Sequence, residues 1–284
     1  MKRNTMQYSF NFNSAGSSLA ALSNTADFTH LTPVLCLHGW LDNAASFIPL
    51  TQQFANLPML AIEFPGHGHS THRSSDAHYY FFDWIQDIVQ LCRQQNWQQL
   101  TIIGHSMGAM VATALAAAFP ELVAKLVLID SLGFVTDTPA HSVKQLRDGV
   151  LSRLKPAIRK PNYADINEAA FARQKQSDFS LVEAMLLAKR GTIASDKGIT
   201  WRADMRLRHS SVYRLSPEQA IALMSAVTCP TLAVIAQDGP FYSKVNALAK
   251  HYQQLQIALV MGGHHCHMTE AEAVAEHIQQ FLAQ

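Results

Sequence analysis

The stretch LTIIGHSMGAMVATALAAAF, residues 100–119, decides the fold. The apolar run at 100–103 predicts a buried strand, and the small-residue run at 106–119 predicts a helix that ends before Pro120. Between them, residues 104–108 match the pattern G-x-S-x-G, which alone is a weak signal but is specific in this strand–turn–helix context. We therefore predict a tight, strained turn that presents Ser106 as a nucleophile.

The same alternation of strands and helices extends over most of the chain. Further strands are expected at 7–12, 18–23, 33–37, 59–62, 125–129, 230–235 and 257–260, and further helices at 80–95 and 270–282. This order predicts an α/β fold with a mostly parallel central sheet and helices on both faces. Functional residues of such sheets gather at the carboxyl ends of strands, where His38, Ser106 and Asp130 fall.

Residues 134–216 differ from the rest because they hold most of the Arg and Lys residues and show no clear strand. We predict that they form a helical cap inserted into a core made of residues 1–133 and 217–284. Lined up with Trp40, Phe134 and Phe241, the apolar cap residues could wall an acyl site. The alternative, favoured for any one of these residues, is that it only packs the cap on the core. The apolar cap residues are Leu181, Val182, Met185, Leu186 and Leu187. We interpret a run of four arginines as a solvated face, or as positive charges that attract an anionic substrate: Arg202, Arg206, Arg208 and Arg214.

Composition excludes several classes of function. The 284 residues are 48% hydrophobic, enough for a sizeable core, and a net charge of +1 gives no case for binding nucleic acid or an anionic membrane. No apolar signal segment is visible, and the near-apolar run at 107–119 is too short to span a bilayer. We expect a cytoplasmic protein without membrane insertion, a monomer or homodimer, whose cysteines (Cys36, Cys92, Cys229 and Cys266) are free thiols.

Three more segments carry a resemblance to a known family. They are LHGWLDNAASF at 37–47, FPGHGHS at 64–70 and GGHHCHM at 262–268. Together with the Ser106 motif they resemble the serine hydrolase-like proteins of the α/β-hydrolase superfamily, with Glu63 where Asp is usual. The resemblance covers residues 31–282 apart from 134–216, and it implies an α/β-hydrolase fold, an esterase-like activity, a helical cap and no cofactor.

The general base is expected in the histidine cluster after Gly263. In this fold the order along the chain is serine, acid, histidine, and the cluster lies between the last strand and the last helix. His264 fits the glycine-then-histidine spacing best, and His265 is the alternative. A metal site at His264, His265 and His267 is disfavoured, because adjacent histidines point in different directions and no partner recurs at ligand spacing except Cys266.

The acid that orients the histidine has two candidates. Asp130 ends the strand at 125–129, and Asp238 follows the strand at 230–235 at the position most often used in this superfamily. The usual register, however, puts Gly239 and not Asp238 at the acid position. We therefore favour Asp130, and Glu63 ranks third because it precedes the serine.

The oxyanion hole requires two backbone N–H donors, for which we predict Met107, directly after the nucleophile, and Trp40, in the loop after His38. The leading hypothesis is a metal-free serine hydrolase that cleaves a small-molecule carboxylic ester through an acyl-enzyme on Ser106. The alternatives are a thioesterase or a carbon–carbon bond hydrolase with the same triad. A non-catalytic binding protein on a hydrolase scaffold is the alternative from another class, because the acid is uncertain.

Overall fold

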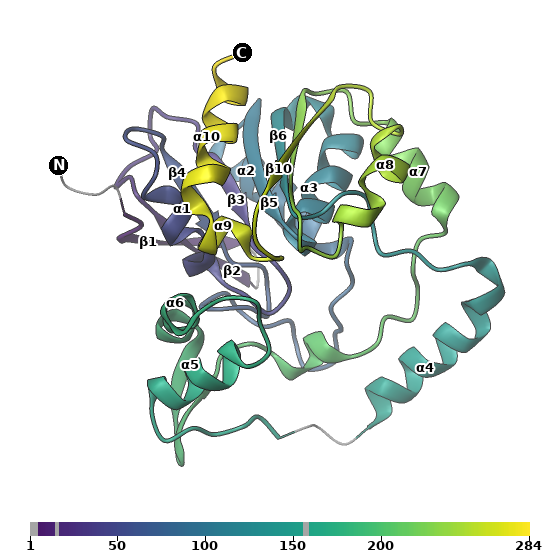
Figure 1. The fold of residues 1–284 in the computed structure, drawn as a ribbon. Coiled ribbons are helices and arrows are strands. Elements are labelled where there is room, and N and C mark those ends of the chain that lie inside the picture. The colour runs from purple at the N-terminus through teal and green to yellow at the C-terminus, as the bar shows by residue number, and fades with distance from the viewer. Residues whose placement is uncertain (1–4, 15–16, 156–158) are drawn as a thin grey trace.

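An eight-stranded sheet forms the centre of the computed structural model, which describes residues 5–14, 17–155 and 159–284 (Figure 1). The strand order is β1-β2-β4-β3-β5-β6-β9-β10; β1 and β2 pair antiparallel, β2 joins β4 antiparallel, and the rest pair parallel. This confirms the predicted α/β fold with a mostly parallel sheet. The strands are β1 (Tyr8–Ser14), β2 (Ser17–Ser23), β3 (Val34–Leu37), β4 (Met59–Ile62), β5 (Leu100–His105), β6 (Val123–Ile129), β9 (Thr231–Ala236) and β10 (Leu255–Val260).

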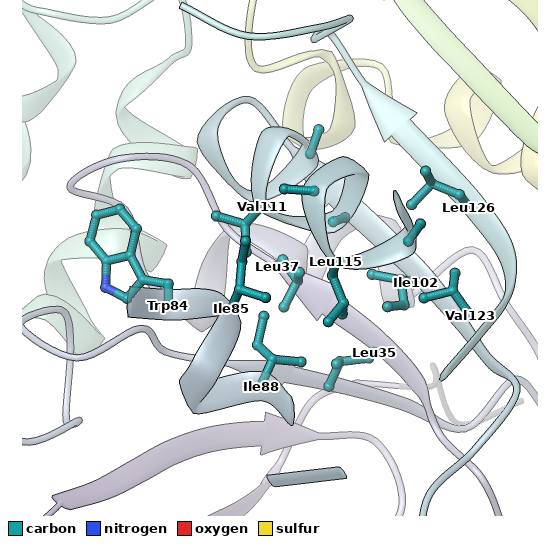
Figure 2. Packing of buried hydrophobic residues seen from close by; sticks show 14 of the residues in the cluster. Leu35, Leu37, Trp84, Ile85, Ile88, Ile102, Val111, Leu115, Val123 and Leu126 are labelled. Carbon is teal, nitrogen blue, oxygen red and sulfur yellow. The ribbon is translucent and has the colours of Figure 1, made fainter. Parts of the chain in front are cut away.

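Helices cover both faces of the sheet. One face packs against α2 (Asp83–Gln95) and α3 (Met107–Ala118), as Figure 2 shows for Ile88, Val111 and Leu115 against strand residues. The other face packs against α10 (Ala271–Leu282). Neighbouring residues of one strand, such as Ile102 and Ile103, belong to the two different core clusters because side chains alternate along a strand.

The helix predicted at 80–95 begins three residues later. The first helical residue is Asp83, and the amide of Ile85 donates to the carbonyl of Phe82. Phe81 instead packs edge-on against Trp84 and Phe134. Phe81 contacts the core although the backbone is not yet helical there, whereas Tyr80 and Phe82 are exposed.

Between β6 and β9 in the chain, α5 (Ile166–Gln174) and α6 (Leu181–Gly191) lie close to each other over one end of the sheet (Figure 1). The prediction that residues 134–216 contain no strand was wrong, because β7 and β8 form a hairpin whose turn is followed by Gly198 at φ 110°. Each strand has four residues, too short to show a clear alternation. The elements are α4 (Ser142–Leu154), α5 (Ile166–Gln174), α6 (Leu181–Gly191), β7 (Thr192–Ser195) and β8 (Gly198–Trp201).

Shorter helices complete the core: α1 (Ile48–Thr51), α7 (Pro217–Ser225), α8 (Val245–Ala249) and α9 (Cys266–Thr269). None of the helices in the described ranges combines the length and the apolar character that a bilayer span needs. The four cysteines are free thiols, and Cys229 is the least buried of them.

Candidate active site

The turn between β5 and α3 places Ser106 in a strained conformation. Its φ of 51° and ψ of −117° lie outside the regions that a non-glycine residue ordinarily adopts. Glycine is needed on both sides of the serine: a Cβ atom at Gly104 would lie 2.5 Å from Cα of Ala109, and one at Gly108 would lie 2.1 Å from the carbonyl oxygen of Leu37. The motif thus lets α3 approach β3 and β5 closely enough to lift the serine clear of the sheet.

His264 links the serine to a buried carboxylate. Its Nε2 lies 2.8 Å from Oγ of Ser106, and its Nδ1 lies 2.6 Å from Oδ2 of Asp130. Asp130 is fully buried, and its Oδ1 accepts a hydrogen bond from the amide of Ala236 at 3.1 Å. A carboxylate on Nδ1 keeps the proton there, so Nε2 is free to accept the proton of the serine hydroxyl.

The other two candidate acids lie elsewhere. Asp238 is exposed, and its amide donates to the carbonyl of Gly262 at 3.0 Å. Glu63 is fully buried and forms an ion pair with Arg190, with 2.7 Å between Nε and Oε1. The structure therefore brings together Ser106, His264 and Asp130 from the predicted set.

Two backbone amides adjoin the serine without a protein partner. β3 pairs with β5 and places Leu37 opposite Gly104, so the loop that contains Trp40 lies beside the Ser106 turn. In the described part of the chain, neither the amide of Trp40 nor that of Met107 donates a hydrogen bond to another residue. Met107 is also the first residue of α3, whose N-terminus carries partial positive charge.

His265, the alternative base, is held in a separate charged network. Its amide donates to Oδ2 of Asp178 at 3.0 Å, its Nδ1 bonds to Oδ1 of the same residue, and its Nε2 lies 3.5 Å from Oδ2 of Asp42. Burial lowers the pKa of His265, but the hydrogen bonds to Asp178 and Asp42 outweigh it and raise the pKa to about 9. Because an imidazolium cannot accept a proton, His265 is unsuited to be the base.

This network joins α5 and the loop after it to the loop after β3, and the sequence did not indicate it. Arg173, in α5, donates to Oδ1 of Asp42 at 2.8 Å, and Asp178 lies between α5 and α6. The residues come from three distant parts of the chain, so no local spacing could have indicated the network. A second missed residue is His105, whose Nε2 lies 2.8 Å from the carbonyl oxygen of His264 and supports the loop that carries the base.

A cavity of about 620 Å³ lies above Ser106 between the core and the cap. Trp40 lines it as predicted, but Phe134, Phe241 and the five apolar residues of α6 do not. Met185, Leu186 and Leu187 pack instead against hydrophobic clusters of the protein, as the favoured alternative has it, whereas Leu181 and Val182 are exposed. The cavity lining consists of Gly39, Trp40, Leu41, Asp42, His105, Ser106, Arg159, Lys160, Pro161, Tyr163, Ala172, Arg173, Gln176, Trp201, Ala203, Asp204, Met205, Arg208, His264 and His265.

The predicted arginine run does not form one solvated face. Arg208 lines the cavity, whereas Arg206 pairs with Asp204 at 2.7 Å and donates to three carbonyls of residues 73–77. As for a metal, the described residues contain no group of three His, Cys, Asp or Glu side chains arranged as ligands.

Comparisons with known proteins identify the fold family of the chain. The family model of the alpha/beta hydrolase fold matches residues 32–271. The chain is 30% identical over 268 residues to a serine hydrolase-like protein of Danio rerio, covering 89% of this chain and 82% of that protein.

Two solved structures have similar folds. A hypothetical protein of Pseudomonas aeruginosa PAO1 superposes with a TM-score of 0.91 at 35% identity, over 97% of this chain and 99% of that one. The thioesterase domain from the curacin biosynthetic pathway superposes with a TM-score of 0.83 at 25% identity, over 97% of this chain and 100% of that domain.

Proposed function

This chain belongs to the α/β-hydrolase fold family, and on that premise we propose that it is a serine hydrolase that cleaves carboxylic esters through an acyl-enzyme on Ser106. The similarity to the serine hydrolase-like protein of Danio rerio supports a hydrolase activity. The observation that carries the proposal is the hydrogen-bonded row Ser106–His264–Asp130, with separations of 2.8 Å and 2.6 Å.

Acylation follows from these positions. His264 Nε2 takes the proton of Ser106 as Oγ attacks the ester carbonyl, and the carbonyl electrons move onto its oxygen. The amides of Trp40 and Met107 hydrogen-bond this oxyanion in the proposed hole, and Asp130 stabilises the imidazolium. His264 then protonates the alcohol oxygen as the carbon–oxygen bond breaks, leaving the acyl group on Ser106.

Deacylation repeats these steps with water. His264 takes a proton from the water as its oxygen attacks the acyl carbon, and the second oxyanion occupies the same hole. When the intermediate collapses, His264 returns the proton to Ser106 Oγ and the carboxylic acid leaves. No step needs a group beyond the residues named and one water molecule.

A thioesterase is the second candidate, favoured by the similarity to the curacin thioesterase domain. The same residues would serve, with a thiolate as leaving group. No observation on the residues that line the cavity favours a carbon–carbon bond hydrolase. The alternative of a non-catalytic binding protein depends on the triad lacking an acid. The hydrogen bond between His264 and Asp130 argues against that alternative.

Hydrolysis of p-nitrophenyl butyrate by the wild type and by Ser106→Ala tests the proposal. The expected result is turnover by the wild type and a loss of at least about 10³-fold in kcat for the variant, because the nucleophile is gone. Ser225→Ala, which alters an exposed serine at the end of α7, is the matched control and should match the wild type. An alanine variant at 106 with wild-type turnover would refute the proposal.

A further inference from the structure

Cations outnumber carboxylates in the lining of the cavity above Ser106. A site for a neutral ester would gain nothing from such an excess, because an unpaired cation in a partly closed cavity loses hydration. The charged lining residues, apart from histidines, are Arg159, Lys160, Arg173 and Arg208 against Asp42 and Asp204.

Both carboxylates already have cationic partners. Asp42 accepts from Arg173 at 2.8 Å, and Asp204 pairs with Arg206 at 2.7 Å and also accepts from the hydroxyl of Tyr79 at 2.9 Å. Across the described ranges, no carboxylate lies within ion-pair distance of Arg159, Lys160 or Arg208. Three cations that line the cavity therefore have no carboxylate at ion-pair distance: Arg159 and Arg208, which are exposed, and Lys160, which is half-buried.

Lys160 is held in place with one donor unused. Its Nζ donates to the carbonyl oxygens of Trp201 and Arg202 at 3.0 and 3.1 Å. An ammonium group has three N–H donors, and in the part of the chain that the structure describes the third has no partner. Partial burial lowers the pKa of Lys160, and the negative charge of Asp204 offsets this only in part.

Arg208 is positioned next to the proposed oxyanion hole. Its guanidinium lies 5.7 Å from the ring centre of Trp40, and the ring Nε1 donates to the carbonyl of Leu207 at 3.2 Å. This contact holds the guanidinium beside the loop that supplies the Trp40 amide. A guanidinium binds carboxylate and phosphate groups through paired hydrogen bonds.

We propose that the substrate of this site carries an anionic group, a carboxylate or a phosphate, that binds Lys160 and Arg208 while the scissile carbonyl lies at Ser106. This inference rests on the proposed function and names its substrate class. The anion supplies acceptors for Lys160, which is half-buried, and for Arg208, which is exposed at the cavity.

Matched substrate pairs test the inference. The mono-p-nitrophenyl esters of adipic and suberic acid are compared with p-nitrophenyl hexanoate and octanoate, which differ by the terminal carboxylate. Acetyl-coenzyme A is compared with the neutral thioester acetyl-N-acetylcysteamine, so a phosphate on the leaving group is distinguished from a carboxylate on the acyl chain. We expect kcat/KM at least about tenfold higher for the anionic member of one pair, mostly through a lower KM.

Variants assign that preference to the two cations. Arg208→Gln and Lys160→Gln should each lower the ratio of anionic to neutral kcat/KM toward one, while Arg147→Gln, an exposed cation of the cap outside the cavity, keeps it. Labelling of Ser106 by a fluorophosphonate shows that each variant is folded. Equal kcat/KM within every substrate pair, or a ratio of anionic to neutral kcat/KM that is unchanged in both variants, would overturn the inference. If neutral esters are still hydrolysed and Ser106 is still labelled, the proposed function stands in either case.

Discussion

Gly239 lies directly against the carboxylate of Asp130: a Cβ atom at position 239 would lie 2.4 Å from Oδ1 and 2.6 Å from Oδ2. Position 239 is where the usual register of the superfamily would put the acid. A side chain there and the Asp130 carboxylate would need the same space. The missing Cβ atom thus makes room for an acid supplied by the end of β6.

Gly239→Ala should therefore disturb the Asp130 carboxylate. We expect kcat to fall about 100-fold, since a displacement on the order of 1 Å in an active site has costs of that size. Steady-state kinetics with p-nitrophenyl butyrate measures this, and Gln237→Ala, an exposed neighbour, is the control. Wild-type kcat in Gly239→Ala would show that the carboxylate position does not matter.

Neutralising the two candidate acids separates them. Asp130→Asn should lower kcat about 10⁴-fold, because an amide at this position no longer stabilises the imidazolium and favours the wrong tautomer of His264. Asp238→Asn should keep kcat within about twofold of the wild type, because Asp238 is exposed. A steep loss confined to Asp238→Asn would assign the acid to the other strand.

Much of the site could be predicted from the sequence because each part follows a strand end. Ser106, Asp130 and His264 all lie just after strands of one parallel sheet, which bring their side chains to one edge. Even the choice of Asp130 followed from a single-residue register argument about Gly239.

The cap could not be predicted to the same depth. Its cavity is lined by residues such as Tyr163 and Trp201, set by packing between short elements rather than by a repeating pattern. The apolar stripe of α6 indicated a buried face but not which surface would bury it. For the β7–β8 hairpin, the β-branched residues on either side of Gly198 were the available signal.

The charged network around His265 should make stability depend on pH. Its pKa is raised from 6.5 to about 9, so the stabilisation is complete below about pH 6.5 and is lost as the pH rises through about 9. Thermal unfolding should show His265→Gln destabilised by about 2 kcal/mol near pH 6.5, with the gap to the wild type closing by pH 10.

His30→Gln, which alters an exposed histidine, is the control for this pH series and should follow the wild type throughout. If the difference in the free energy of unfolding between His265→Gln and the wild type stays constant from pH 6.5 to pH 10, His265 is not charged in the folded protein.

The buried pair of Arg190 and Glu63 fastens α6 to the core. Arg190→Met should cost about 3 kcal/mol in the free energy of unfolding, because it leaves the fully buried carboxylate of Glu63 without its cation. The double variant Arg190→Met, Glu63→Gln should recover part of that loss, since no buried charge is then unpaired. Chemical denaturation measures both variants.

Lys144→Met provides the contrast. Lys144 pairs with Asp148 on the exposed surface of α4, so its loss should leave the free energy of unfolding close to that of the wild type. Equal costs at the buried and the exposed pair would contradict this account of how the cap is attached.

The central claim is that Ser106 is a nucleophile activated by His264, and covalent labelling tests it most directly. Intact-mass analysis after incubation with a fluorophosphonate should show one adduct per chain, mapped to Ser106 by peptide sequencing. Ser106→Ala should stay unlabelled, and His264→Gln should label far more slowly. A wild-type protein that stays unlabelled, or a Ser106→Ala variant that labels as fast as the wild type, would contradict the account.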